Sequence, residues 1–348
     1  MRRLGASRRK PDLDSSVGGR EAAGGGQTSM MDQSIKNFPK QFLFNPEIQN
    51  ANKLARLSRF VVLGMGGSSL AAELLKMARP GADIIFHRDY DLPEIDLKNT
   101  LVIASSYSGN TEETISGFEQ ARRENLPIAV ISVGGKLIEL ARESGIPFIQ
   151  LPNDGIQPRM GLGYQIRALF KLMKLDEELL ETGRLANSLD VAAAASAGER
   201  LAENLSGRVP IIYASERNGT LARNWKIAFN ETGKIPAFYN ILPELNHNEM
   251  IGFDATAASR PLSEKFHFIF LREPADDERV QRRMKILEKL YRDLGFGVEL
   301  IDLEGKDIWE KIFGSLLTGV WAAYYLALSY GAEPEQVPMV EEFKKLIA

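Results

Sequence analysis

A glutamate and a histidine stand in one polar segment of the second half of the chain, FNETGKIPAFYNILPELNHNEM at residues 229–250. Glu231 precedes His247 by sixteen positions. A carboxylate and an imidazole are suitable side chains for moving a proton between two atoms of a substrate. Taken alone, however, one such pair is better explained as two surface residues. It indicates acid–base chemistry only in combination with other signals.

The first of two turns rich in glycine and hydroxyl groups lies in GMGGSSLAAELL, residues 64–75. It follows an apolar, β-branched run and opens a helical pattern. Gly67 lets the backbone approach a ligand closely, and Ser68 stands where the free N–H groups of a helix N-terminus suit a phosphate dianion. The alternative is an ordinary tight turn, because the pattern is neither GxGxxG nor a P-loop.

The second turn lies in SSYSGNTEET, residues 105–114, and carries three hydroxyls: Ser106, Ser108 and Thr111. Hydroxyls and backbone N–H groups together can bind a phosphate without a metal. The alternative is a helix cap in which Asn110 and Glu113 form a capping box, and both interpretations can hold together. Ligands of α/β folds bind at the carboxyl ends of parallel strands, which is where both turns are expected.

The elements that must position these side chains form two blocks of alternating strand and helix patterns. Strand-like runs of the first block are 58–64, 82–88, 100–106, 127–133 and 147–152. Those of the second block are 208–215, 265–273 and 297–303, with helical patterns at 222–234 and 278–295. This alternation predicts parallel sheets covered by helices on both faces. The two blocks resemble a weak internal duplication of one unit.

The expected fold class is therefore α/β, with two doubly wound domains at residues 31–155 and 156–348. The second includes C-terminal helices at 312–331 and 337–348. Helix 312–331 is apolar nearly all round, which predicts burial or a place at a subunit interface. Residues 1–30 are rich in Gly, Ser and Arg without apolar periodicity, and we expect a disordered extension there. A basic targeting arm is the alternative.

Composition narrows the classes of function. The 348 residues carry a net charge of −3, which argues against a broad nucleic-acid interface. There is no cysteine, which excludes disulfides, thiolate metal sites and cysteine nucleophiles and fits a reducing, cytoplasmic location. The three histidines have no metal-ligand spacing, and no run approaches the ~20 apolar residues of a membrane span. We therefore expect neither a metal nor a membrane partner.

The two hydroxyl turns, GMGGSS and SYSGNTEE, together resemble the signature of the sugar isomerase (SIS) domain. Such domains bind phosphosugars on a five-stranded parallel sheet. The resemblance implies two SIS-type domains in this chain. It also implies that Ser68, Ser106, Ser108 and Thr111 hold the phosphate of a small phosphosugar.

The segment 229–250 makes the resemblance more specific. Its N-E-x-x-K-I and P-E-x-x-H-N patterns are similar to those of the bifunctional phosphoglucose/phosphomannose isomerases, and the resemblance extends over residues 31–348. It implies interconversion of glucose 6-phosphate and/or mannose 6-phosphate with fructose 6-phosphate, through a cis-enediolate and without metal or organic cofactor. Glu231 is then the catalytic base. His247 is the ring-opening group, supplied by the other subunit of a homodimer.

Two more residues are carried over from the family. Arg159, in QPR, would stabilise the enediolate, since an oriented cation beside a developing oxyanion is a strong catalytic element. Its alternative is a solvated linker charge. Lys344, in EEFKKL, would assist ring opening, and its alternative is an ordinary surface lysine. The family threonine seven residues before that lysine is replaced by Val337, with Gln336 beside it, which favours glucose 6-phosphate over mannose 6-phosphate.

Two other functions remain open at this point. SIS domains also serve as non-catalytic phosphosugar sensors, but binding alone does not need Glu231, His247 and Arg159, and no helix-turn-helix pattern suggests a regulator. The other is an aminosugar-phosphate isomerase of the amidotransferase type. The absence of cysteine removes the usual glutaminase nucleophile of that class.

Overall fold

The apolar runs of the first block form a five-stranded parallel sheet in the computed structural model, which describes residues 30–347. The strand order is β2-β1-β3-β4-β5. The strands are β1 Arg59–Leu63, β2 Asp83–His87, β3 Thr100–Ser105, β4 Ile128–Ser132 and β5 Phe148–Gln150. Every residue of β3 and β4 is buried, as expected when helices cover both faces of a parallel sheet.

The second block forms a smaller parallel sheet with the order β7-β6-β8-β9, the same topology as the first four strands of the first sheet. Its strands are β6 Val209–Ser215, β7 Phe238–Leu242, β8 Phe266–Arg272 and β9 Gly297–Asp302. The predicted duplication is thus confirmed in topology. Within the described residues this sheet has four strands, not the expected five, because the chain enters a long helix after β9.

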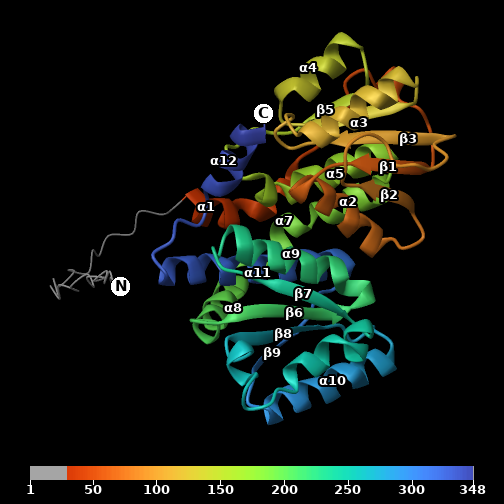
Figure 1. The fold of residues 1–348 in the computed structure, drawn as a ribbon. Coiled ribbons are helices and arrows are strands. Elements are labelled where there is room, and N and C mark those ends of the chain that lie inside the picture. The colour runs from red at the N-terminus through yellow and green to blue at the C-terminus, as the bar shows by residue number, and fades with distance from the viewer. Residues whose placement is uncertain (1–29, 348) are drawn as a thin grey trace, which may run out of the picture.

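Helices occupy the layer between the two sheets and cover their outer faces (Figure 1). The α-helices are α1 Met30–Asn37, α2 Gly66–Ala78, α3 Glu112–Arg123, α4 Gly135–Glu143, α5 Leu162–Met173, α6 Asp176–Gly183, α7 Leu185–Ser188, α8 Val191–Asn204, α9 Gly219–Glu231, α10 Glu278–Asp293, α11 Ile308–Ser329 and α12 Pro338–Ile347. Short 3-10 helices are η1 Phe38–Leu43, η2 Ala51–Lys53, η3 Pro158–Met160, η4 Glu216–Asn218, η5 Glu244–His247, η6 Glu249–Phe253 and η7 Arg260–Leu262. Of the expected extension, residues 1–29 lie outside the described residues, and Met30 already belongs to α1.

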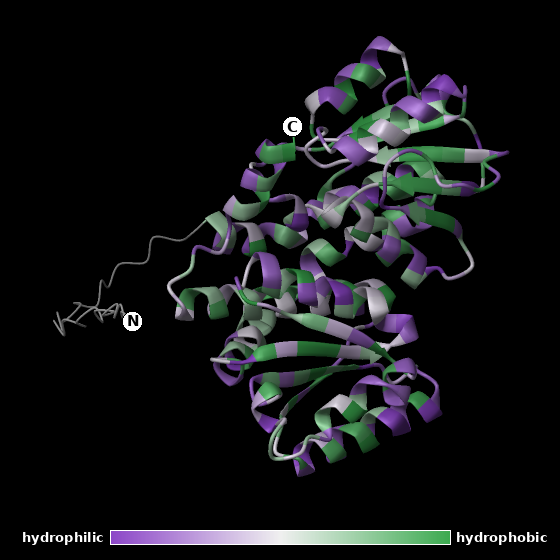
Figure 2. Ribbon diagram, in the orientation of Figure 1, coloured by the Kyte–Doolittle hydropathy of each residue, from purple (hydrophilic) through white to green (hydrophobic). Residues whose placement is uncertain are grey.

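Alternate strand residues enter different cores, since successive side chains point to opposite faces of a sheet. Phe60 and Val62 of β1 face a central core that α2, α5, α9 and α11 share between the two sheets. Val61 and Leu63 face an outer core under α3 and α4. A third core lies between the second sheet and α10. Figure 2 shows the apolar residues concentrated along the strands and the hydrophilic ones on the outer helices.

The expected tail helix, α11, belongs to the central core and packs against α8 and α9. Ile312, Phe313 and Trp321 are almost fully buried. Contrary to the expectation that no segment is long enough, α11 alone among the described helices has the length and hydropathy of a membrane span. Two thirds of its most apolar window is buried inside the fold, which identifies it as a core helix.

Helix α5 closes the inner face of the first sheet by packing against α2 and β4, although the sequence places it after the expected boundary at residues 155/156. The layer between the sheets thus contains helices from both halves of the chain. The domain boundary itself remains a prediction. The segments at this junction, η3 and the end of α9, carry Arg159 and Glu231.

Candidate active site

The first glycine turn lies close to two other segments, the end of β3 and the junction segment η3. A side chain at Gly64 would place its Cβ 2.8 Å from the backbone oxygen of Ser105, and one at Gly67 would meet the backbone oxygen of Pro158 at the same distance. The Cα of Arg159 would be 3.3 Å from that second Cβ. The glycines thus allow the N-terminus of α2 to touch both the second turn and the junction segment.

The two turns are joined by one hydrogen bond. The Ser68 hydroxyl, which is buried, accepts a hydrogen bond from the Tyr107 backbone N–H at 3.0 Å. Burial raises the pKa of the Tyr107 phenol to about 12, so this group stays protonated at neutral pH. Because Ser68 acts as the acceptor of the Tyr107 N–H, it fixes the second turn and its own hydroxyl proton remains available to a ligand.

Within the second turn the hydroxyls play different parts. The oxygens of Ser106 and Thr111 are 2.8 Å apart, and Ser106 also accepts the Gly109 N–H at 3.0 Å. Ser108 is exposed and, among residues 30–347, accepts one hydrogen bond, from the Asn110 N–H at 3.3 Å. Ser106 thus shapes the turn from inside, whereas Ser108 presents its hydroxyl to solvent.

The alternative capping box at this turn does not form. Helix α3 begins after Thr111, and no side chain there makes a capping hydrogen bond. The side-chain oxygen of Asn110 instead accepts the Lys136 N–H at 3.0 Å, from the first turn of α4. Asn110 therefore joins the turn after β3 to the start of α4 instead of capping α3.

Arg159 and Glu231 meet across the junction, with 3.5 Å between Nη1 and Oε2. The Arg159 side chain is 8% exposed and that of Glu231 is 39% exposed. Burial lowers the pKa of Arg159, and the nearby charges of Glu231 and Glu335 oppose this shift. A guanidinium remains charged under any ordinary condition. The site therefore holds a buried cation beside a carboxylate that a ligand can reach.

Three further hydrogen bonds hold the Arg159 guanidinium. Its Nε donates to Thr232 Oγ1 at 3.0 Å, and its Nη2 donates to the backbone oxygens of Pro334 at 2.9 Å and Glu335 at 2.7 Å. The alternative of a solvated linker charge is thus wrong. The sequence pattern revealed the arginine but not these partners, because two of them are backbone carbonyls from the far end of the chain.

Lys234 is a site residue that the sequence interpretation did not single out. Its Nζ donates to the Glu231 backbone oxygen at 2.7 Å and to the Gln336 backbone oxygen. Burial and the neighbouring charge of Arg159 lower its pKa. The signal was present as the lysine of N-E-x-x-K-I, at a spacing that returns the side chain to the end of α9.

The structure does not bring His247 or Lys344 to the Arg159–Glu231 contact within this chain. His247 ends η5 on the surface, and among the described residues its ring makes no hydrogen bond or ion pair. Lys344 is 62% exposed on α12, where it binds Glu341 at 2.8 Å. On a single chain Lys344 is an exposed lysine, and its role in ring opening stays a prediction.

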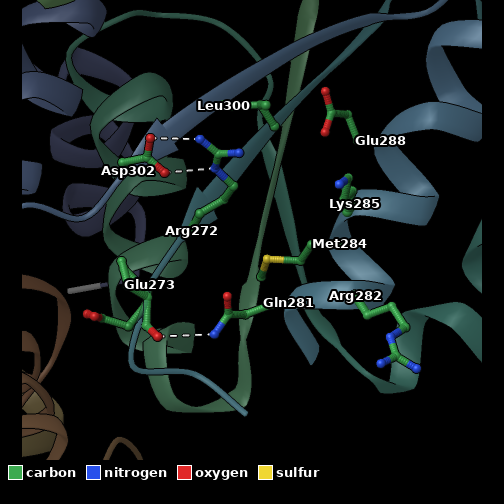
Figure 3. Close-up of a pocket in the computed structure, with 10 residues that line it drawn as sticks. Arg272, Glu273, Gln281, Arg282, Met284, Lys285, Glu288, Leu300 and Asp302 are labelled. Carbon is green, nitrogen blue, oxygen red and sulfur yellow. Dashed lines mark hydrogen bonds and ion pairs between the residues drawn. The ribbon is translucent and has the colours of Figure 1, made fainter. Parts of the chain in front are cut away.

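A cavity of about 570 Å³ lies elsewhere, at the carboxyl ends of β8 and β9 beside α10 (Figure 3). Arg272 and Asp302 pair across it at 2.7 and 2.8 Å. None of the expected site residues lines it. Two of its carboxylates bind cations that are not part of the lining: Glu273 binds Lys311 and Glu288 binds Arg292. No group of three His, Asp or Glu side chains in residues 30–347 is arranged to hold a metal ion.

Two parallel sheets of one topology, with hydroxyl-rich turns at the carboxyl ends of the first, define a double SIS-domain protein. Residues 194–347 match the family described as the bacterial phospho-glucose isomerase C-terminal SIS domain. The glucosamine-6-phosphate deaminase structure from Thermotoga maritima has a TM-score of 0.64 at 13% identity, covering 88% of this chain and 96% of that one. That likeness concerns the fold alone.

Curated relatives identify the family. The bifunctional phosphoglucose/phosphomannose isomerase of Caldicellulosiruptor bescii is 32% identical over 91% of this chain and 99% of its own length. That of Aquifex aeolicus is 31% identical over 85% and 92%. The D-glucosamine-6-phosphate 4-epimerase of Sulfolobus acidocaldarius is 29% identical over 86% and 90%. The chain belongs to the bifunctional phosphoglucose/phosphomannose isomerase family.

Proposed function

We propose that this protein interconverts glucose 6-phosphate, and to a lesser extent mannose 6-phosphate, with fructose 6-phosphate. The observation that carries the proposal is the contact between Arg159 and Glu231 beside the Gly67 turn, in a chain that belongs to this family. A proton acceptor next to a fixed cation is the arrangement that enediolate chemistry requires. A binding module has no need of it, which argues against the phosphosugar sensor.

In this proposal the phosphate binds at the two hydroxyl turns. Ser68 lies in the first turn of α2, where backbone N–H groups and the helix dipole favour an anion. Ser108 offers an exposed hydroxyl from the neighbouring turn, and Ser106 and Thr111 complete the ring of donors. The contact of Gly67 with Pro158 and Arg159 then puts the sugar carbons within reach of the junction, with the phosphate as the anchor.

The reaction begins with opening of the sugar ring, assigned to His247 with help from Lys344. Glu231 then removes the proton from C2 of the open aldose, and the pair of electrons left behind forms the enediolate. The hydroxyl proton passes from O2 to O1, and Glu231 returns its proton to C1 as C2 becomes the carbonyl carbon. Its negative oxygen lies against the Arg159 guanidinium. Because three hydrogen bonds and the ion pair with Glu231 already fix this cation, it needs little reorganisation as charge develops. The acid and base are side chains, so no cofactor takes part.

A homodimer completes the site in this proposal. His247 has no partner on its own chain among the described residues, and α12 exposes an apolar stripe instead of burying it: Met339, Val340, Phe343, Leu346 and Ile347 are 45–84% exposed. An amphipathic helix of this kind gains stability by covering that stripe. A second copy of the chain would cover it and present His247 to the neighbouring Glu231. We place the enzyme in the cytoplasm, as its cysteine-free composition suggests.

The test is a coupled assay of purified protein with glucose 6-phosphate, mannose 6-phosphate and glucosamine 6-phosphate, the Glu231→Gln variant serving as blank. We expect fructose 6-phosphate from the first substrate and, more slowly, from the second. The 4-epimerase relative makes epimerisation of glucosamine 6-phosphate the second candidate. An epimer formed from that substrate, with no fructose 6-phosphate from the other two, would replace our assignment by this one.

A further inference from the structure

Two cations of the site hold the same short stretch of backbone near the C-terminus. Arg159 donates to the carbonyls of Pro334 and Glu335, and Lys234 donates to the next carbonyl, that of Gln336. Arg159 lies in η3, 175 positions before Pro334, and Lys234 lies in the loop after α9, 102 positions before Gln336. Two cations, one buried and one half-buried, thus bind three successive carbonyls and attach this stretch to the site. We call residues 334–336 the C-terminal strap.

Lys234 links the strap to the end of helix α9. Its backbone has a φ of 57°, in the left-handed region that residues other than glycine rarely adopt, and its side chain turns back onto the carbonyl of Glu231. A cation at the end of a helix satisfies carbonyls that have no partner inside the helix. Lys234 therefore caps α9 at its last residue, the expected base, and ties the strap to that same residue.

The strap joins helix α12 to the rest of the described chain. Helix α12 begins at Pro338 and has no buried residue among those described. Pro334 and Glu335 before it are buried, and Glu335 has its pKa raised by burial and by the neighbouring charge of Glu333. The position of α12, and of Lys344 on it, is accordingly set by how firmly residues 334–336 are held.

We propose that Lys234 is a positioning residue of the active site: it fixes the C-terminal strap against the end of α9 and thereby sets Arg159, Glu231 and the helix that carries Lys344. It does not touch substrate in this assignment. The inference rests on the proposed isomerase activity for its kinetic consequence, but the attachment itself can be measured without any substrate.

The kinetic consequence differs from that of a purely structural lysine. Without Lys234, Arg159 would be the one cation of the two that still holds the strap, and the base and cation would lose their fixed relation. Small displacements of catalytic groups reduce turnover strongly, by up to about 10²-fold for 1 Å. The phosphate turns belong to the first sheet and do not contact Lys234, so substrate binding would change little. A structural lysine would instead lower the melting temperature and leave turnover per folded molecule unchanged.

The experiment compares Lys234→Met, which keeps the aliphatic stem and removes the donor, with Lys234→Arg, which restores a donor. The matched control is Lys76→Met, because Lys76 also holds a backbone carbonyl beyond a helix end, that of Ala82 at 2.6 Å, away from the site. Amide hydrogen exchange of peptides covering 333–347 is measured without substrate, and kcat and KM for fructose 6-phosphate are measured alongside the melting temperature.

We expect Lys234→Met to speed exchange in the strap and α12 and to lower kcat about tenfold or more, with KM changed less than about threefold. Lys234→Arg should recover much of both, and Lys76→Met should change neither. Unchanged exchange in 333–347, or an unchanged kcat, would overturn the proposal. If the wild-type protein has no isomerase activity, the proposed function fails, whereas the exchange result still decides the attachment. Should Lys234→Met not fold, Lys234→Gln is judged by the same criteria.

Discussion

Arg159 and Glu231 are 72 positions apart in the chain, yet they meet at 3.5 Å where the two sheets join. Arg159 precedes the helix that covers the first sheet, and Glu231 ends a helix that packs beside the second. The pair thus joins the segment between the two sheets to a helix of the second block. The candidate site is therefore a property of the junction, and changes that loosen the junction should act on catalysis as well as on stability.

Glu231→Gln is the sharpest test of the base. The amide keeps the size and hydrogen-bonding capacity of the side chain but does not accept the substrate proton. We expect turnover to fall at least ~10²-fold, the low end for loss of a general base, with inhibitor binding retained. Glu288→Gln is the control, since Glu288 also pairs with an arginine, at 3.0 Å, on the remote helix α10. Near-normal turnover of Glu231→Gln would rule out this base.

Ser108→Ala tests the phosphate anchor without disturbing the turn. Ser106 is 1% exposed and shapes the loop, whereas Ser108 is exposed and makes one weak local hydrogen bond. Loss of one hydrogen bond to a dianion should raise KM about tenfold and leave kcat nearly unchanged. Ser144→Ala removes an exposed hydroxyl of the same domain and should have no effect. If replacing Ser106, Ser108 and Thr111 together leaves inhibitor affinity unchanged, the phosphate binds elsewhere.

The buried carboxylate Glu73 should make stability depend on the junction and on pH. It is 4% exposed in α2 and receives Arg223 of α9 at 2.5 and 2.7 Å, with Arg88 at 2.6 Å. Burial would raise the pKa of Glu73, but hydrogen bonds from Arg223 and Ser69 outweigh it and hold the pKa below 4.5. The stability that this ionised group contributes is complete above pH 4.5 and is lost as the pH falls through the lower, folded-state value.

Arg223→Met should accordingly lower the free energy of unfolding by about 3 kcal/mol at pH 7, because it leaves a buried charge with one partner fewer. The loss should shrink in acid as Glu73 becomes protonated. Arg292→Met removes a partly exposed pair with Glu288 and should cost less than about 1 kcal/mol. Urea unfolding at pH 7 and pH 4 measures both. Equal losses for the two variants at pH 7 would show that the pair across the junction has no special role.

The sequence predicted the features that depend on local pattern. The eight strand-like runs are all strands in the structure, because a few consecutive apolar and β-branched residues are enough to signal a buried strand. Both hydroxyl turns lie at strand ends. Strand β7 was not predicted. Its FYNIL sequence lies at a sheet edge with Phe238 and Tyr239 exposed, so it lacks the pattern of a buried strand. The contacts of Arg159 and Lys234 with the strap were not predicted, for another reason. Backbone carbonyls carry no sequence signature, and only the folded chain brings them to those cations.

The last prediction concerns the assembly. If His247 completes the site of a second subunit, each active site needs an intact Glu231 from one chain and an intact His247 from the other. Glu231→Gln and His247→Ala are then each inactive alone. In a heterodimer of the two variants one site carries both lesions and the other carries neither, because closed two-fold dimers use each interface residue twice.

Unfolding and refolding an equal mixture of the two variants should restore about a quarter of wild-type activity, since half of randomly paired dimers are mixed and each has one intact site. Each variant refolded alone is the control and should stay inactive. Phe343→Asp, which puts a charge on the exposed apolar stripe of α12, should reduce the recovery by weakening the dimer. Mixed dimers verified by mass spectrometry but without activity would place Glu231 and His247 in the site of one chain and remove the partner subunit from the mechanism.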